Sequence, residues 1–106
     1  MREVKEMVTT AWVLMEVADA MCLPSSRSAV VTLFRHLYES SEVTIVPASS
    51  ALFLRALSLY EQRPDKSWSL TDCSSFISMQ DKGIALALTA DHHFEQAGFQ
   101  ITFKNP

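Results

Sequence analysis

The sequence predicts an α/β fold in which helices flank a mostly parallel sheet. Short segments rich in β-branched or apolar residues recur along the chain, and stretches with apolar residues at helical spacing alternate with them. This alternation is typical of parallel strands connected by helices. The length of 106 residues, with 48% hydrophobic and 20% charged residues, suits one compact domain spanning residues 1–106.

In the first half of the chain, strand-like segments alternate with helical ones. REVKEM, residues 2–7, has helical residue types and looks like the end of a helix, whereas VTT, residues 8–10, is strand-like. Residues 12–22 carry apolar side chains at helical spacing. LPSS then stops this helix and is expected to supply a serine cap for the next one, which precedes the β-branched strand VTIV, residues 43–46.

The second half continues the same alternation. A helix follows Ser49 and ends near Pro64, because a proline disfavours helical geometry in the residue before it. Ser69 is the expected N-cap of the next helix, which ends at Gly83. Residues 84–89, IALALT, form an apolar run typical of a strand buried on both faces. A helical turn in HHFEQAGF and a strand in QITF follow.

Charge and composition exclude several classes of protein. A net charge of −3 argues against nucleic-acid binding through a broad basic field, although a local basic rim remains compatible with it. Cys22 and Cys73 lie far apart in apolar helical segments, so we expect two reduced, buried thiols. No apolar run approaches the ~20 residues that span a bilayer, and the N-terminus lacks a signal-peptide core. We therefore expect a cytoplasmic protein without a membrane segment.

Three carboxylates are candidate metal ligands. Asp91 directly follows a predicted buried strand, and Asp72 lies in the first turn of the preceding helix, so both are expected at the carboxyl edge of the sheet. Glu16, about two turns into its helix, is expected to reach the same edge. Carboxylates that converge repel one another unless a divalent cation such as Mg²⁺ neutralises them. Such a cluster suits metal-assisted hydrolysis of phosphodiesters.

Each of these acids also has a purely structural interpretation, which the residues alone leave open. Ser69 and Asp72 have the spacing of a capping box. Glu16 fits a solvated helix face, and Asp91 is a plausible N-cap for the turn that starts at His92.

Other reactive side chains give weaker signals. Adjacent imidazoles diverge along a helix or strand, so His92 and His93 are not expected to bind zinc together. Cys73 lacks the strand-turn-helix elbow of a hydrolase nucleophile. The aromatic residues are expected in the core or at an interface: Trp12, Trp68, Phe76 and Phe94. Three cations flank a phosphate path or are scattered surface charges: Arg55, Arg63 and Lys66.

Two segments resemble the PIN domain, especially the small VapC-type toxin ribonucleases. They are VTTAWVLMEVADAM and RPDKSWSLTDCSSFISMQDKGIALALTADHHFEQAGF, in that order. The resemblance implies a PIN-like three-layer fold in which acids at the carboxyl edge of a parallel sheet bind Mg²⁺ or Mn²⁺ and RNA is hydrolysed. By motif, Glu16, Asp72 and Asp91 match the second, third and fourth acids of the family. Ser69 would position the turn that carries Asp72.

The chain departs from the family pattern at its beginning. The family starts with a central strand that carries its first metal-binding Asp, followed by a long helix, and this sequence starts where that helix would be ending. The expected fold is therefore N-terminally truncated, and whether it is an enzyme stays open. The unpaired strand edges that result favour strand exchange or a homodimer.

Three functions follow from these observations. The first is a divalent-metal-dependent endoribonuclease of toxin-antitoxin type, with RNA as substrate and a cognate antitoxin protein as partner. The alternative is a catalytically inactive, truncated PIN remnant that acts as a protein-interaction module. A receiver-like signalling domain is a third reading, and it is disfavoured because the sequence has no early DD pair.

Overall fold

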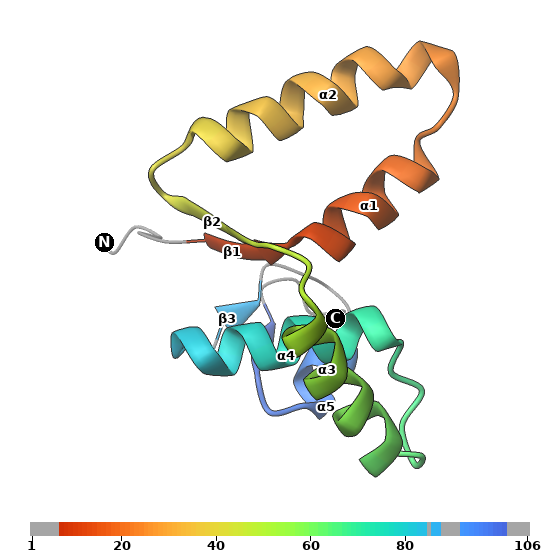
Figure 1. Ribbon diagram of the computed structural model, residues 1–106, viewed down its shortest axis with the longest axis vertical. Helices are drawn as coiled ribbons and strands as arrows, with labels where there is room; N and C mark the ends of the chain where they lie inside the picture. Colours follow the sequence, from red (N-terminus) through yellow and green to blue (C-terminus); the bar gives the residue numbers. More distant parts are fainter. Residues whose placement is uncertain (1–6, 85, 88–91, 102–106) are drawn as a thin grey trace. The chain divides into compact units, whose positions relative to one another are not determined.

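The computed structural model describes residues 7–84, 86–87 and 92–101 (Figure 1). The chain divides into two compact units, Met1–Ala48 and Ser49–Pro106. Within the described ranges, one or two helices separate each of the four short strands from the next, and both pairs of strands are parallel. This confirms the predicted α/β class and the parallel pairing.

The first unit is a two-stranded parallel sheet with a helical crossover. Its elements are β1 (Met7–Thr10), α1 (Ala11–Ala20), α2 (Pro24–Glu39) and β2 (Val43–Val46). The register pairs Met7 with Val43 and continues to Thr10 with Val46. Figure 1 shows α1 and α2 carrying the chain from the end of β1 back to the start of β2. Both strands are close to the predicted segments.

Local capping explains where the helices of the first unit begin. The Thr10 hydroxyl is the N-cap of α1 and accepts a hydrogen bond from the Val13 N–H at 3.2 Å. By contrast, α2 has Leu23 at its N-cap with no side-chain cap, and Pro24 opens the helix. Proline suits this first position because its fixed φ is helical and its missing N–H would have no partner there. The predicted serine cap of this helix is therefore wrong.

The first unit also corrects the prediction for one cysteine. Cys22 is exposed in the connection between α1 and α2, so only Cys73 is a buried thiol, and both are free. The prediction failed because Cys22 lies just beyond the last turn of α1, where the packed face of the helix no longer continues. Residues 2–6 of the predicted helix tail lie outside the described residues, and Met7 belongs to β1.

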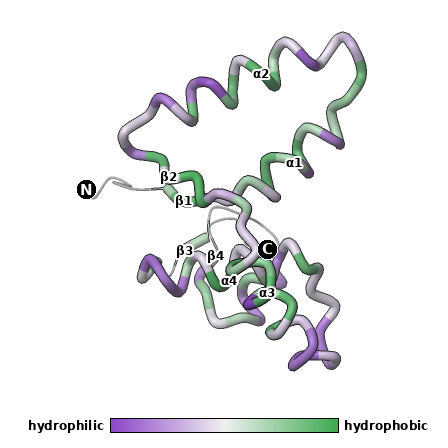
Figure 2. Tube along the Cα trace, viewed as in Figure 1, coloured by the Kyte–Doolittle hydropathy of each residue, from purple (hydrophilic) through white to green (hydrophobic). Residues whose placement is uncertain are grey.

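Many apolar side chains on the two helices of the first unit are exposed. Leu14 and Val30 are the buried anchors of α1 and α2. Large apolar side chains are exposed elsewhere in α1, α2 and their connection: Met15, Met21, Leu23, Val31, Leu33 and Tyr38. Figure 2 shows hydrophobic colours along β1 and β2 and mixed colours along α2.

The second unit contains three helices and a second short parallel pair of strands. Its elements are α3 (Ser50–Gln62), α4 (Leu70–Lys82), β3 (Leu86–Ala87), α5 (His92–Gln96) and β4 (Gln100–Ile101). Ser49 caps α3 through a hydrogen bond from the Leu52 N–H at 3.1 Å. Gly83 ends α4 with φ of 69°, a left-handed conformation that glycine adopts without strain. Of the predicted strand 84–89, residues 85 and 88–89 lie outside the described residues.

The core of the second unit is organised around Phe76 on α4. Phe76 is 1% exposed, and its ring packs edge-on against Trp68 and Phe94, with centroids 5.0 and 4.9 Å away. Phe99 lies at 5.8 Å in a tilted arrangement. Edge-to-face contacts of this kind place positive ring edges against negative ring faces. The structure confirms that Trp68 and Phe76 are core residues.

Candidate functional site

Asp72 is held at the start of α4 by a reciprocal capping box. The Asp72 N–H donates to the Ser69 hydroxyl at 2.9 Å, and the Ser69 N–H donates to Asp72 Oδ2 at 3.0 Å. These two bonds satisfy backbone donors that the first turn of a helix otherwise leaves unpaired. The carboxylate also lies where the helix dipole favours negative charge. The structural interpretation of Asp72 is therefore confirmed.

The same carboxylate meets an imidazole from α5. His93 Nδ1 lies 3.2 Å from Asp72 Oδ2, and the two side chains are 24% and 19% exposed. Both contacts of Asp72 thus fall on Oδ2, whereas Oδ1 accepts no hydrogen bond from the described residues. Asp72 is fixed in position and still offers one oxygen to a ligand.

Glu16 and Asp72 belong to different units, and each is described within its own unit. Glu16 is exposed on α1 in the first unit, on the helix that Thr10 caps. Asp91 lies outside the described residues. Whether the three carboxylates share a site therefore stays a prediction.

His93 is the residue of this site that sequence reasoning missed. The two adjacent imidazoles were expected to diverge, but their ring centroids lie 4.9 Å apart at 57°. His93 is separated from Asp72 by 21 positions, and no local motif links the two. Only the packing of α5 beside α4 brings them together.

Cys73 is next to Asp72 in sequence but is unsuited to nucleophilic chemistry. Its side chain is 0% exposed. Burial, and to a smaller extent the neighbouring carboxylate of Asp72, raise the pKa of the Cys73 thiol. A thiol in this environment stays protonated at neutral pH, whereas the thiolate is the reactive form. This agrees with the prediction that Cys73 is not a nucleophile.

The Asp72 carboxylate can supply one oxygen ligand to a hard cation. Mg²⁺ is usually bound through one or two carboxylates together with water and substrate phosphates. Asp72 Oδ1 meets this requirement as a single ligand. In the part of the chain that the structure describes, no three His, Cys, Asp or Glu side chains are grouped closely enough to hold a metal.

None of the helices in the described ranges combines the length and the hydrophobicity that a membrane crossing requires. One ion pair joins α3 and α4 at the surface of the second unit. Arg55 on α3 donates two hydrogen bonds to the carboxylate of Asp81 on α4, at 2.7 and 2.9 Å. Arg55 is therefore a partner in a structural ion pair.

Comparison with known proteins places the chain in a family. The PIN domain model matches residues 1–100. The structure is similar to the crystal structure of Mycobacterium tuberculosis VapC20, a sarcin-ricin loop cleaving toxin, with a TM-score of 0.78 and 25% sequence identity. That similarity covers 92% of this chain and 74% of the VapC20 chain. No curated protein matches the sequence. The chain belongs to the PIN domain family, and its structure resembles that of a VapC toxin ribonuclease.

Proposed function

We propose that the protein is a divalent-metal-dependent endoribonuclease of toxin-antitoxin type that hydrolyses RNA phosphodiesters. The observation that carries this proposal is the state of Asp72, whose Oδ2 is fixed by Ser69 and His93 while Oδ1 accepts no hydrogen bond from the described residues. Membership of the PIN family and the likeness to VapC20 support it.

In this proposal Glu16, Asp72 and Asp91 hold Mg²⁺ or Mn²⁺. When bound, such an ion activates a water molecule and offsets the negative charge that develops on the phosphate. Ser69 keeps the Asp72 carboxylate oriented through the capping box. His93, on α5, contacts the same carboxylate. The Asp72 side chain is therefore already oriented before RNA binds.

The proposed substrate is structured RNA, and the likeness to VapC20 suggests a sarcin-ricin loop hairpin as the first one to test. The purified chain is incubated with this hairpin and with an unrelated hairpin, in Mn²⁺, in Mg²⁺ and in EDTA. We expect cleavage with either ion and none in EDTA. Absence of cleavage by a folded chain with both ions would contradict the proposal.

Matched variants separate the candidate ligands from acids elsewhere on the same helices. Asp72→Asn and Glu16→Gln should abolish cleavage, because a neutral amide is a poor ligand for a hard cation. Asp81→Asn, on the same helix as Asp72, and Asp19→Asn, on the same helix as Glu16, should cleave like the parent chain. Equal loss in a control would point to destabilised helices rather than to missing ligands.

The second candidate function is that of a catalytically inactive PIN domain that binds other proteins. The specific observation in its favour is the set of exposed apolar side chains on α1 and α2. Large exposed apolar side chains supply area that a partner protein buries on binding. A cognate antitoxin or a second copy of the chain is the proposed partner, and light scattering after size exclusion would detect the homodimer.

A further inference from the structure

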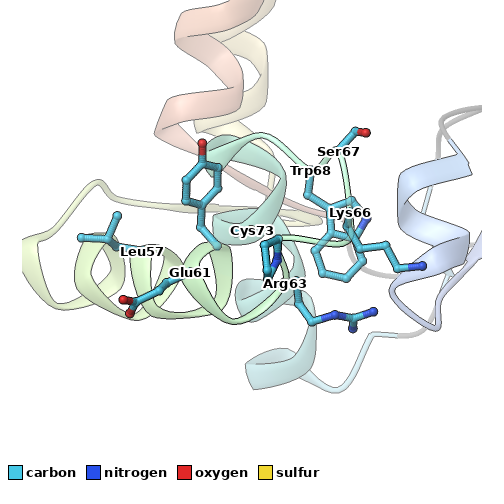
Figure 3. Close-up of a pocket in the computed structure, with 9 residues that line it drawn as sticks. Leu57, Glu61, Arg63, Lys66, Ser67, Trp68 and Cys73 are labelled. Carbon is cyan, nitrogen blue, oxygen red and sulfur yellow. The ribbon is translucent and has the colours of Figure 1, made fainter.

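A cavity of about 740 Å³ lies beside the candidate site, entirely within the second unit. It is lined by the end of α3, the loop between α3 and α4, and Cys73 at the start of α4 (Figure 3). Its volume is in the range of pockets that bind small organic groups. The loop residues Lys66 to Trp68 directly precede the Ser69 cap, so the wall of the cavity and the turn that carries Asp72 are continuous in the chain.

Arg63 forms a fixed planar surface in this cavity. Its Nε and Nη2 atoms donate to the two carboxylate oxygens of Asp65, both at 3.0 Å. Its Cζ lies 5.1 Å from the centre of the Trp68 ring, a distance typical of a cation-π contact. The guanidinium is thus held by two neighbours, yet 39% of the Arg63 side chain remains exposed.

Two contacts hold the Trp68 side chain in place. Its Nε1–H donates to Gln96 Oε1 at 3.0 Å, and its ring packs edge-on against Phe76. Only 6% of Trp68 is exposed, so it serves as the base of the cavity rather than as an open stacking surface. Tyr60, which also lines the cavity, is 50% exposed and offers an accessible aromatic ring.

Lys66 supplies the positive charge of the cavity. Its ammonium makes no ion pair within 4.0 Å among the described residues, whereas Arg63 pairs with Asp65. The Lys66 charge also acts on Asp65, where it adds a small contribution to lowering the pKa of that carboxyl. Figure 3 shows the Lys66 ammonium and the Arg63 guanidinium on the side of the pocket away from Leu57 and Glu61. The Lys66 N–H donates to the Arg63 carbonyl at 3.1 Å, which fixes the turn between them.

We propose that this cavity, the Arg63 pocket, binds one unpaired nucleotide of the RNA substrate. The base stacks on the Arg63 guanidinium and on Tyr60, and one phosphate contacts the Lys66 ammonium. The one ammonium of Lys66 matches the charge of one phosphate group. The flat Arg63 guanidinium and the exposed Tyr60 ring suit a planar base, which an acidic peptide does not offer. The inference rests on the proposed function and assigns a binding site to one nucleotide of its substrate.

The binding test uses the tryptophan already in the pocket. Trp12→Phe leaves Trp68 as the only tryptophan of the chain, so its fluorescence reports on the pocket. A short oligouridylate is titrated in EDTA, which removes any contribution from a bound metal. We expect saturable quenching of Trp68, whereas inorganic phosphate at the same concentration should produce little. Quenching by an acidic peptide but not by the oligonucleotide would overturn the proposal.

Variants distinguish the stacking contact from the phosphate contact. In the Trp12→Phe background, Tyr60→Leu should weaken oligouridylate binding by about fivefold or more without changing its salt dependence. Lys66→Gln should weaken binding and reduce the slope of log affinity against log salt by about 0.7, as expected for one lost phosphate contact on a single strand. Lys82→Gln, on an exposed lysine at the far end of α4, is the matched control and should change neither quantity.

Metal-dependent cleavage then separates this inference from the proposed function. Loss of binding in Tyr60→Leu and Lys66→Gln supports the pocket, even if the parent chain does not cleave RNA. Cleavage by the parent chain with unchanged binding and cleavage in both variants would overturn the pocket and leave the ribonuclease proposal intact. Unchanged circular dichroism in each variant ensures that the comparison is made between folded chains.

Discussion

The carboxylate of Asp72 and the imidazole of His93 meet at 3.2 Å between α4 and α5. The same carboxylate oxygen accepts the Ser69 N–H of the capping box. Asp72 therefore links the start of α4 to α5, which begins 20 residues after Asp72, at His92. This link bears on both the stability of the second unit and its proposed chemistry.

The contact predicts that His93 positions Asp72 in the proposed reaction. His93→Gln should lower the cleavage rate by about 10-fold and raise the Mn²⁺ concentration needed for half-maximal cleavage, as is usual when a partner that orients a metal ligand is lost. His92→Gln is the matched control, because His92 is the exposed neighbour in the same helix. A lower rate with an unchanged Mn²⁺ requirement would argue against a positioning role.

The capping box predicts a measurable contribution to stability. Ser69→Ala removes the acceptor for the Asp72 N–H and should lower the free energy of unfolding by about 1 kcal/mol. Ser25→Ala, in the first turn of α2, should have almost no effect, because that helix has no side-chain cap. Urea denaturation measures both values. Equal effects of the two substitutions would contradict this assignment of the cap.

The aromatic core predicts that truncating Phe76 destabilises the protein much more than truncating Phe53. Phe76→Ala should lower the free energy of unfolding by about 3–5 kcal/mol, because it leaves a cavity among three aromatic rings. Phe53→Ala removes the same atoms from a residue that is 41% exposed and should cost clearly less. Denaturant midpoints of the two variants give the comparison. A similar loss in both would mean that Phe76 is not the centre of the core.

The two free thiols should react at very different rates. Cys22 is exposed, whereas Cys73 is fully buried and its pKa is raised by burial. We expect alkylation of one thiol per chain under native conditions and of the second only in denaturant. Mass spectrometry of the digested protein identifies the modified residue. Rapid native modification of Cys73 would be inconsistent with the packing of α4.

The ion pair between Arg55 and Asp81 predicts a weak acid dependence of stability. The hydrogen bond from Arg55 holds the pKa of Asp81 below its ordinary value of 3.8. Because the unfolded chain binds this proton more readily, the contribution of the pair is present above the ordinary value and is lost as the pH falls through the lower value of the folded protein. The effect should be small and should shrink in salt, since the pair is exposed.

Asp81→Asn tests this dependence. The difference in unfolding free energy between the parent chain and Asp81→Asn should be constant near neutral pH and decrease at acidic pH. Asp19→Asn, an exposed acid on α1, provides the baseline for removing one negative charge. A difference that does not change with pH would show that the carboxylate pairs no more strongly in the folded state than in the unfolded one.

The sequence alone determined the features that depend on neighbouring residues. The capping box at Ser69 and Asp72, the glycine at Gly83 and the strand VTIV were predicted correctly, because helix caps and strand propensity act over a few positions. The start of α2 was mispredicted for a local reason as well, since Pro24 and the two serines after it compete as start signals. The family resemblance was also readable from short motifs, and the PIN domain match confirms it.

Only the tertiary structure decided which distant side chains meet. Asp72 contacts His93, Trp68 donates to Gln96 and Arg55 pairs with Asp81 across separations of 21 to 28 residues. None of these pairs has a local signal, because each joins segments that are far apart in the sequence and meet only in the folded chain. For the same reason the exposure of Cys22 and the cavity beside Arg63 could not be read from the sequence. Local chemistry set the helices and their caps, and packing between them set the contacts on which the proposed functions depend.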